Sequence, residues 1–325
     1  MPVNANYIPN EELQILRLIF MGTPNYAIPV LDKLVRSGHD IAAVYTQPDR
    51  PAGRGRILTP TPIKSHATDL GLETVEARDF SDNSSSLAYM LSFGADAAVV
   101  AAYGIMLPSF VINEFPLGMI NLHPSLLPKL RGASPVATAI LQGYTETGVT
   151  IMKIDEGMDT GPILKQKSVR IGANEKCDDL TERLFILGSN LLVDTLGEIQ
   201  TKKEKILPQD PSKATVTKRL KREDGEIDWT QSSEQISRAI RAFHPWPGTF
   251  TKFGGKRLKI LEAGINDKGP GTLDSGEVHC KDNVKVGTGS GSISLLSIQL
   301  EGKTPTNASD FASHTPDFDG AILGT

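Results

Sequence analysis

The sequence has little cysteine and lacks both a long apolar run and a dinucleotide-binding motif. Cys177 and Cys280 are its two cysteines, too few and too far apart for a disulfide framework or a cysteine-based zinc site. No apolar stretch reaches the roughly 18 residues of a membrane span. Met1 to Glu12 is polar and unlike a signal peptide. Gly22 stands alone where a Gly-x-Gly-x-x-Gly fingerprint needs three glycines. We expect a cytoplasmic protein that needs no metal and has no membrane partner.

Positive charge is concentrated in one part of the chain. The net charge is −4, yet residues 201–260 hold fourteen Lys and Arg against seven Asp and Glu. This asymmetry predicts a basic, nucleic-acid-binding module joined to an acidic catalytic part. A solvated linker and surface is the alternative interpretation. The length of 325 residues favours two domains over one.

Short apolar runs alternate with helical patterns in the first half. Such alternation predicts an α/β fold with a doubly wound, mostly parallel sheet. We expect strands at 16–21, 41–45, 72–75, 97–102, 119–122, 149–154 and 163–169. We expect helices at 28–35, 63–70, 84–93 and 180–199.

The pattern changes near residue 201. A charged, proline-containing linker is followed by one helical pattern and several short strand-like runs with Gly-rich turns, which predict a small, OB-like β-barrel. The predicted division is an N-terminal extension at 1–14, a catalytic domain at 15–201, a linker at 202–217 and a C-terminal domain at 218–325. Trp246 lies between two prolines, and we expect it in the core or between domains rather than as a base-stacking platform.

Three polar residues are candidates for catalysis. Asn121 and His123 are two positions apart at the end of an apolar strand, so their side chains share one face. Asp159 follows in a Gly-Met-Asp-Thr-Gly segment. A neutral donor, a titratable ring and a carboxylate suit transfer of a small acyl group to an amine. A packed polar pair and an ordinary Asp turn are the alternatives.

The sequence around this polar triplet resembles the folate-dependent formyltransferases. The resemblance is carried by Asn121-Leu122-His123, by Ser125 to Pro128 and by Gly157 to Gly161. It implies a doubly wound sheet and 10-formyltetrahydrofolate as the formyl donor. It also implies folate contacts by Ser125, Leu126, Leu127 and Pro128, by an apolar pterin pocket of Ile105, Met106 and Leu107, and by the backbone near Asp155. Ordinary core is the alternative for the three residues at 105–107.

Three further segments resemble the members of that family that act on methionyl initiator tRNA. They are Thr46 to Gly55, Gly22 to Ala27 and Arg241 to Pro247. The resemblance implies a monomer whose partner is initiator methionyl-tRNA. Arginine suits phosphate contacts, and Lys and Arg clusters add affinity for nucleic acid. The predicted tRNA-binding residues are Arg50, Arg54, Arg56, Lys218, Arg219, Lys221 and Arg222.

The reaction assigns a role to each member of the polar triplet. Attack of an amine on the formyl carbon develops an oxyanion, to which Asn121 or a protonated His123 can donate. Asp159 either stabilises the imidazolium form of His123 or accepts the proton of the amine, directly or through water. A formyltransferase for a small amine and an RNA-binding module without catalysis are the rival functions.

Overall fold

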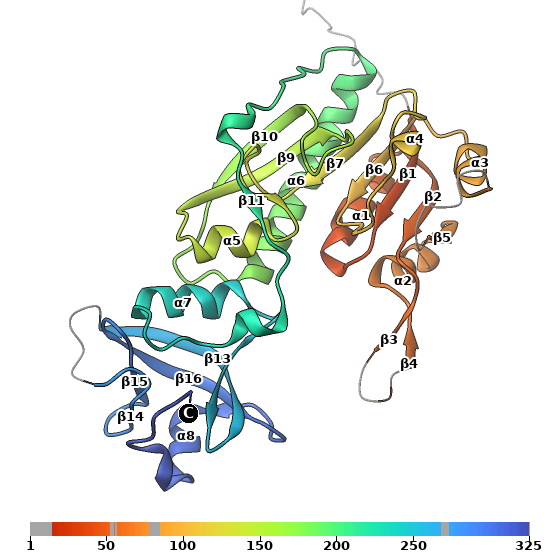
Figure 1. Ribbon diagram of the computed structural model, residues 1–325. Coiled ribbons are helices and arrows are strands. Elements are labelled where there is room, and N and C mark those ends of the chain that lie inside the picture. The colour runs from red at the N-terminus through yellow and green to blue at the C-terminus, as the bar shows by residue number, and fades with distance from the viewer. Residues whose placement is uncertain (1–14, 53–54, 56, 78–84, 268–272, 325) are drawn as a thin grey trace, which may run out of the picture. The chain divides into compact units, whose positions relative to one another are not determined.

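The computed structural model describes residues 15–52, 55, 57–77, 85–267 and 273–324 (Figure 1). Arg54, Arg56 and the predicted N-terminal extension lie outside these residues. Within them, no helix is both long and apolar enough to cross a membrane.

The larger sheet has seven strands, in the order β10-β9-β7-β6-β1-β2-β5. The pairs β1–β2, β1–β6, β2–β5 and β6–β7 are parallel, and β7–β9 is antiparallel. The chain moves outward from β1 through β2 to β5 and then returns to the other side of β1 at β6. This reversal is the hallmark of a doubly wound sheet, which places ligands at the carboxyl ends of its strands. The strands are β1 (Arg17–Gly22), β2 (Asp40–Thr46), β5 (Thr74–Glu76), β6 (Ala97–Ala101), β7 (Met119–His123), β9 (Glu146–Lys153) and β10 (Ile163–Arg170).

Helices cover both faces of this sheet because alternate strand residues point to opposite sides. On β1, Leu18 and Phe20 join the apolar core on one face. Ile19 and Met21 join the core on the other face. The first core is covered by α1 (Ile28–Arg36), α2 (Pro62–Asp69) and the later part of α6 (Cys177–Gln200). The second is covered by α3 (Ser85–Ser92) and α4 (Ser109–Ile112). The predicted α/β class is confirmed.

Local sequence signals explain where the first helices begin and end. Pro29 and Pro62 lie in the first turns of α1 and α2, where a missing N–H costs nothing. Thr61 caps α2, because its side chain accepts a hydrogen bond from the Lys64 amide. Gly38 follows α1 with a φ of 82°, a left-handed conformation that glycine adopts without strain.

The C-terminal sheet is separate and antiparallel. Its path is β12-β13-β16-β15-β14, and β17 also pairs with β16. Its core includes Leu258, Ile260, Ile293 and Ile298, against which Ile236 of α7 packs. The strands are β12 (Thr249–Phe253), β13 (Lys256–Asp267), β14 (Val278–His279), β15 (Lys285–Gly287), β16 (Ser292–Leu300) and β17 (Thr306–Asn307). The helices are α7 (Ser233–Ala242) and α8 (Ala308–Ser313).

Short elements complete the fold. The strands β3 (Arg50–Ala52) and β4 (Ile57–Thr59) pair as an antiparallel hairpin. The strands β8 (Arg131–Gly132) and β11 (Val216–Thr217) pair in parallel, so the predicted linker ends in a strand. The remaining elements are α5 (Pro135–Leu141) and the 3₁₀ turns η1 (Asn25–Ala27), η2 (Pro211–Lys213), η3 (Arg222–Gly225) and η4 (Pro316–Phe318).

The chain forms two compact units whose limits differ from the predicted domain boundaries. The first contains Met1–His123, Val149–Lys167 and Phe185–Pro211, and the second contains Pro124–Gly148, Ser168–Leu184 and Ser212–Thr325. Segments from before residue 201 belong to the second unit because they share an apolar cluster with it. This cluster joins Val136 of α5 and Leu184 of α6 to Phe243. The predicted boundaries at 201 and 218 stay a prediction.

Candidate active site

Strand β7 presents the first two residues of the polar triplet on one side of the sheet. Met119 belongs to the core covered by α3 and α4, whereas Ile120 and Leu122 belong to the opposite core. By alternation, Asn121 and His123 share the side of Met119. Asn121 is half-buried and His123 is 4% exposed. Both therefore lie near the carboxyl end of a central strand, between β6 and β9.

Asp159 reaches this strand from the loop between β9 and β10. Its Oδ1 atom lies 3.6 Å from Nδ1 of His123, within ion-pair range. The side chain of His123 is 5% exposed and that of Asp159 is 18% exposed, so water screens the pair weakly. The fold therefore brings together an imidazole and a carboxylate beside the carboxamide of Asn121.

The loop that carries Asp159 has a compact conformation that is held by internal hydrogen bonds. Asp159 itself has a φ of 54°, a conformation that Asp tolerates better than most residues. At Gly161 a Cβ atom would lie 1.9 Å from the carbonyl oxygen of Lys153, so only glycine fits there. The carboxylate of Asp155 accepts hydrogen bonds from the Gly157 amide at 3.1 Å and the Thr160 hydroxyl at 2.6 Å.

Gln209 holds this loop from outside it. Its Nε2 atom donates to the carbonyl oxygen of Asp159 at 2.8 Å and to that of Gly161 at 2.7 Å. Gln209 lies in the segment that the sequence predicts as a linker, and reasoning from sequence missed it. No local signal marks it, because an isolated Gln in a polar stretch is typical of any exposed loop.

Two family models match most of the chain. One, described as formyl transferase, matches residues 15–196, and the other, formyl transferase, C-terminal domain, matches residues 219–316.

The chain belongs to the formyl transferase family.

Individual relatives agree with this assignment. A methionyl-tRNA formyltransferase of Dehalococcoides mccartyi (strain CBDB1) is 40% identical over 310 residues, which cover 95% of this chain and 99% of the relative. The fold resembles the N-formyltransferase of Helicobacter canadensis, solved with folinic acid and dTDP-3-aminofucose, with a TM-score of 0.62 and 19% identity over 87% of this chain and 99% of that one. It also resembles the methionyl-tRNA formyltransferase of Clostridium thermocellum, with a TM-score of 0.55 and 20% identity over 78% and 94%. The chain is a formyltransferase, as its sequence predicts.

The predicted folate-binding residues of this formyltransferase differ in exposure. Leu107 is 8% exposed and belongs to the core on the side of Asn121, and Ile105 packs against that core. Met106, in contrast, is 69% exposed. Ser125 and Leu127 are buried, Leu126 and Pro128 are half-buried, and the Ser125 hydroxyl donates to the Lys129 carbonyl at 2.7 Å. The contacts of all these residues with folate stay a prediction.

Of the predicted tRNA-binding arginines in the first unit, Arg50 is the one described. It begins β3, is exposed, and donates from Nη2 to Oε1 of Gln47 at 2.8 Å. The Nε2 atom of Gln47 donates in turn to the carbonyl oxygen of Tyr103 at 2.9 Å. Arg50 is therefore linked through Gln47 to the segment that carries Ile105 and Leu107.

The basic cluster of the second unit is at the surface. Lys218, Arg219, Lys221 and Arg222 are all exposed. Nζ of Lys218 lies 2.6 Å from Oδ1 of Asp224. This contact and the hydrogen bond from the Lys221 amide lower the pKa of the Asp224 carboxyl below its ordinary value. Trp246 is 56% exposed, so its predicted core position is wrong, whereas its predicted position between domains stays a prediction.

Side chains that could bind a metal ion do not form a cluster in the described part of the chain. Among those residues, no three His, Cys, Asp or Glu side chains are placed to hold a metal ion. Both described cysteines are free thiols, and burial raises the pKa of Cys177 to about 11.

Proposed function

We propose that the protein transfers the formyl group of 10-formyltetrahydrofolate to the α-amino group of methionyl initiator tRNA, giving N-formylmethionyl-tRNA. The observation that carries this proposal is the match to the Dehalococcoides protein named methionyl-tRNA formyltransferase, which spans both units and 99% of that relative. The proposed enzyme is a monomer and acts in the cytoplasm. Its binding partners are the folate and the tRNA.

Asn121 acts on the oxygen of the formyl group. An α-amino group has a reference pKa of about 8, so a fraction of it is neutral near pH 7. Its nitrogen attacks the formyl carbon, and the carbonyl oxygen becomes an oxyanion. The carboxamide of Asn121, fixed on a central strand, donates a hydrogen bond to that oxyanion.

Asp159 acts through His123. Oδ1 of Asp159 lies 3.6 Å from Nδ1 of His123, so the carboxylate attracts the ring when the ring carries a positive charge. The protonated ring then donates to the oxyanion from its other nitrogen. As the intermediate collapses, the bond between the formyl carbon and the folate nitrogen breaks, the amine loses a proton, and the folate nitrogen gains one.

The pterin of the folate occupies the side of the sheet that carries Asn121 and His123. Ile105 and Leu107 support this placement, since both join the apolar core on that side. The loop from Asp155 to Asp159 supplies backbone groups for the polar edge of the ring. Ser125 to Pro128 follow β7 directly and supply further contacts. The folate needs no metal for this chemistry.

Basic residues of each unit contact the tRNA. In the first unit these are Arg50, which begins β3, and Arg54 and Arg56, which lie outside the described residues. In the second unit they are Lys218, Arg219, Lys221 and Arg222. Arg222 also lines a cavity of about 620 Å³, in which Arg257 stacks 3.9 Å from the ring centroid of Phe250. Phosphate contacts of this kind add affinity that salt weakens.

Incubation of the purified enzyme with 10-formyltetrahydrofolate and three acceptors tests the proposal. The acceptors are methionyl initiator tRNA, glycinamide ribonucleotide and a dTDP-linked amino sugar. We expect formylmethionyl-tRNA and no product from the small amines. Product from a small amine alone would assign the enzyme to that substrate class. Binding of tRNA without turnover would make the chain an RNA-binding protein.

A further inference from the structure

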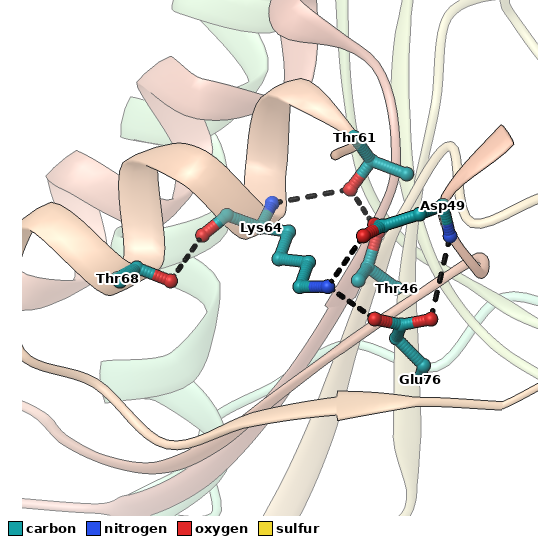
Figure 2. Close-up of polar contacts among 6 residues, drawn as sticks. All are labelled: Thr46, Asp49, Thr61, Lys64, Thr68 and Glu76. Carbon is teal, nitrogen blue, oxygen red and sulfur yellow. Dashed lines mark hydrogen bonds and ion pairs between the residues drawn. The ribbon is translucent and has the colours of Figure 1, made fainter. Parts of the chain in front are cut away.

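Lys64 joins two carboxylates from separate parts of the first unit. Its Nζ atom lies 2.8 Å from Oδ2 of Asp49 and also pairs with Oε1 of Glu76 (Figure 2). Lys64 stands in the first turn of α2, Asp49 directly precedes β3, and Glu76 ends β5. The side chains of Lys64 and Asp49 are 25% and 19% exposed. The contact is therefore partly shielded from solvent.

Further hydrogen bonds connect the same three segments. The amide of Asp49 donates to Oε2 of Glu76 at 3.3 Å. The hydroxyl of Thr61 accepts from the amide of Lys64 at 3.1 Å and pairs with the hydroxyl of Thr46 at 2.7 Å (Figure 2). Because Thr46 is fully buried at the end of β2, this network ties the base of the β3–β4 hairpin to the sheet.

Apart from the contact of Arg50 with Gln47, the described residues of the hairpin have little buried surface to fix its direction. Ile57 and Leu58 of β4 are 71% and 64% exposed, and Thr59 is exposed as well. A two-stranded hairpin without a buried face is marginal on its own. Its orientation therefore depends on the residues at its base, of which Lys64 is the one that carries positive charge between Asp49 and Glu76.

We propose that Lys64 is a positioning residue for tRNA, which holds the β3–β4 hairpin at the angle needed to receive the acceptor end. The inference rests on the proposed function, because it assigns the hairpin to tRNA. Without the ammonium group, Asp49 and Glu76 face each other as unneutralised carboxylates, and their repulsion opens the base of the hairpin. Lys64 touches neither the folate nor the formyl group in this scheme.

Two measurements on Lys64→Met test the proposal. The first is amide hydrogen exchange of the intact enzyme without substrates, in which we expect faster exchange confined to the hairpin and its base. The second is steady-state kinetics, in which we expect the KM for methionyl-tRNA to rise roughly tenfold while the KM for the formyl donor stays constant. Lys64→Arg keeps the charge and is expected to restore most of the loss.

Lys165→Met is the matched control. Lys165 pairs with Glu198 at 2.6 Å in the same unit, and the two side chains are 30% and 37% exposed. We expect it to change neither measurement. Unchanged exchange in Lys64→Met, or an equal rise of both KM values, would overturn the proposal. If Lys64→Met does not fold, Glu76→Gln, which removes one of the two contacts, is measured in the same way.

The exchange measurement separates this inference from the proposed function. If the wild-type enzyme fails to formylate methionyl-tRNA, the proposed function is wrong whatever the exchange data give. If the wild type formylates methionyl-tRNA and Lys64→Met behaves like the wild type in both measurements, the role of Lys64 alone is wrong.

Discussion

Nδ1 of His123 lies 3.6 Å from Oδ1 of Asp159. The two residues come from a central strand and from a loop beyond the next strand, and both side chains are largely shielded from water. At this distance the carboxylate attracts the ring whenever the ring carries a positive charge. The proposed chemistry depends on this pair and on Asn121, which shares the face of His123.

Asp159→Asn tests whether the carboxylate works by its charge. The amide has nearly the same shape but cannot stabilise an imidazolium. We expect kcat to fall by about 10²–10⁴-fold, as for loss of acid–base support, with both KM values nearly constant. Stopped-assay kinetics with methionyl-tRNA measure this. Asp194→Asn, on the exposed side of α6, is the control, and equal rates for the two variants would exclude Asp159 from the chemistry.

Asn121→Ala removes the proposed donor to the oxyanion. Loss of one such donor costs about 3 kcal/mol in the transition state, or about 100-fold in kcat. The KM values change little, because the hydrogen bond strengthens only as the oxyanion forms. Asn113→Ala, which loses an exposed side-chain hydrogen bond to the Ser109 carbonyl, is the control. A kcat within twofold of the wild type would remove Asn121 from the mechanism.

Gln209→Ala tests whether the loop that carries Asp159 must be held from outside. The substitution removes two hydrogen bonds to loop carbonyl groups, worth about 1 kcal/mol each. We expect kcat to fall roughly tenfold and the melting temperature to fall by only a few degrees. Asn190→Ala removes a comparable amide-to-carbonyl bond on α6 and is expected to leave kcat unchanged. Equal activity of the two variants would argue against the role of Gln209.

Gly161→Ala probes the same loop by steric conflict. The added Cβ would lie 1.9 Å from the carbonyl oxygen of Lys153, so the backbone must move. We expect a loss of roughly 1–3 kcal/mol in the free energy of unfolding and a lower kcat. Gly264→Ala is the control, because a Cβ there meets no atom within 4 Å. Urea denaturation and steady-state kinetics measure the two effects. A Gly161→Ala enzyme with the stability and kcat of the wild type would show that the loop accommodates the added methyl group.

Glu175 makes stability depend on acid pH. Burial opposes its ionisation, yet bonds from the Arg183 side chain and the Gly172 amide, with the charge of Arg241, hold its pKa below the ordinary 4.5. A lowered pKa gives stability that is present above pH 4.5 and lost as pH falls through the folded-state value.

Urea denaturation over a pH series measures this contribution. After allowance for solvent screening, Glu175→Gln should lower the free energy of unfolding by roughly 1 kcal/mol at pH 7. The free energy of unfolding of this variant should also fall less steeply than that of the wild type as the pH drops below 4.5. Glu114→Gln, at an exposed position, should behave like the wild type. Parallel pH curves for the wild type and Glu175→Gln would contradict the assignment.

Residue patterns in the sequence predict the sheet and two residues of the candidate site, Asn121 and His123, for a physical reason. Alternation along β7 alone places Asn121 and His123 on one face, and the apolar runs around it predict buried strands. The approach of Asp159 to His123 follows from no local pattern and was predicted through the family resemblance. The loop also accepts two hydrogen bonds from Gln209, a residue distant in the sequence, and no local pattern predicts these contacts.

Exposure was harder to predict than position. The core position predicted for Trp246 was wrong, and Met106 is exposed although its neighbours Ile105 and Leu107 are half-buried and buried. For side chains in loops and hairpins, burial depends on which distant segment packs over them, and local hydrophobicity does not encode that. The exposed Ile57 and Leu58 of the hairpin illustrate the same point.

The most direct test is a single-turnover assay of formylmethionyl-tRNA with excess enzyme and 10-formyltetrahydrofolate. It compares the wild type with a variant in which Asn121, His123 and Asp159 are all alanine. We expect the wild type to convert methionyl-tRNA completely and the triple variant to form product no faster than the reaction without enzyme. Conversion by the triple variant at the wild-type rate, or no conversion by the wild type, would contradict the account.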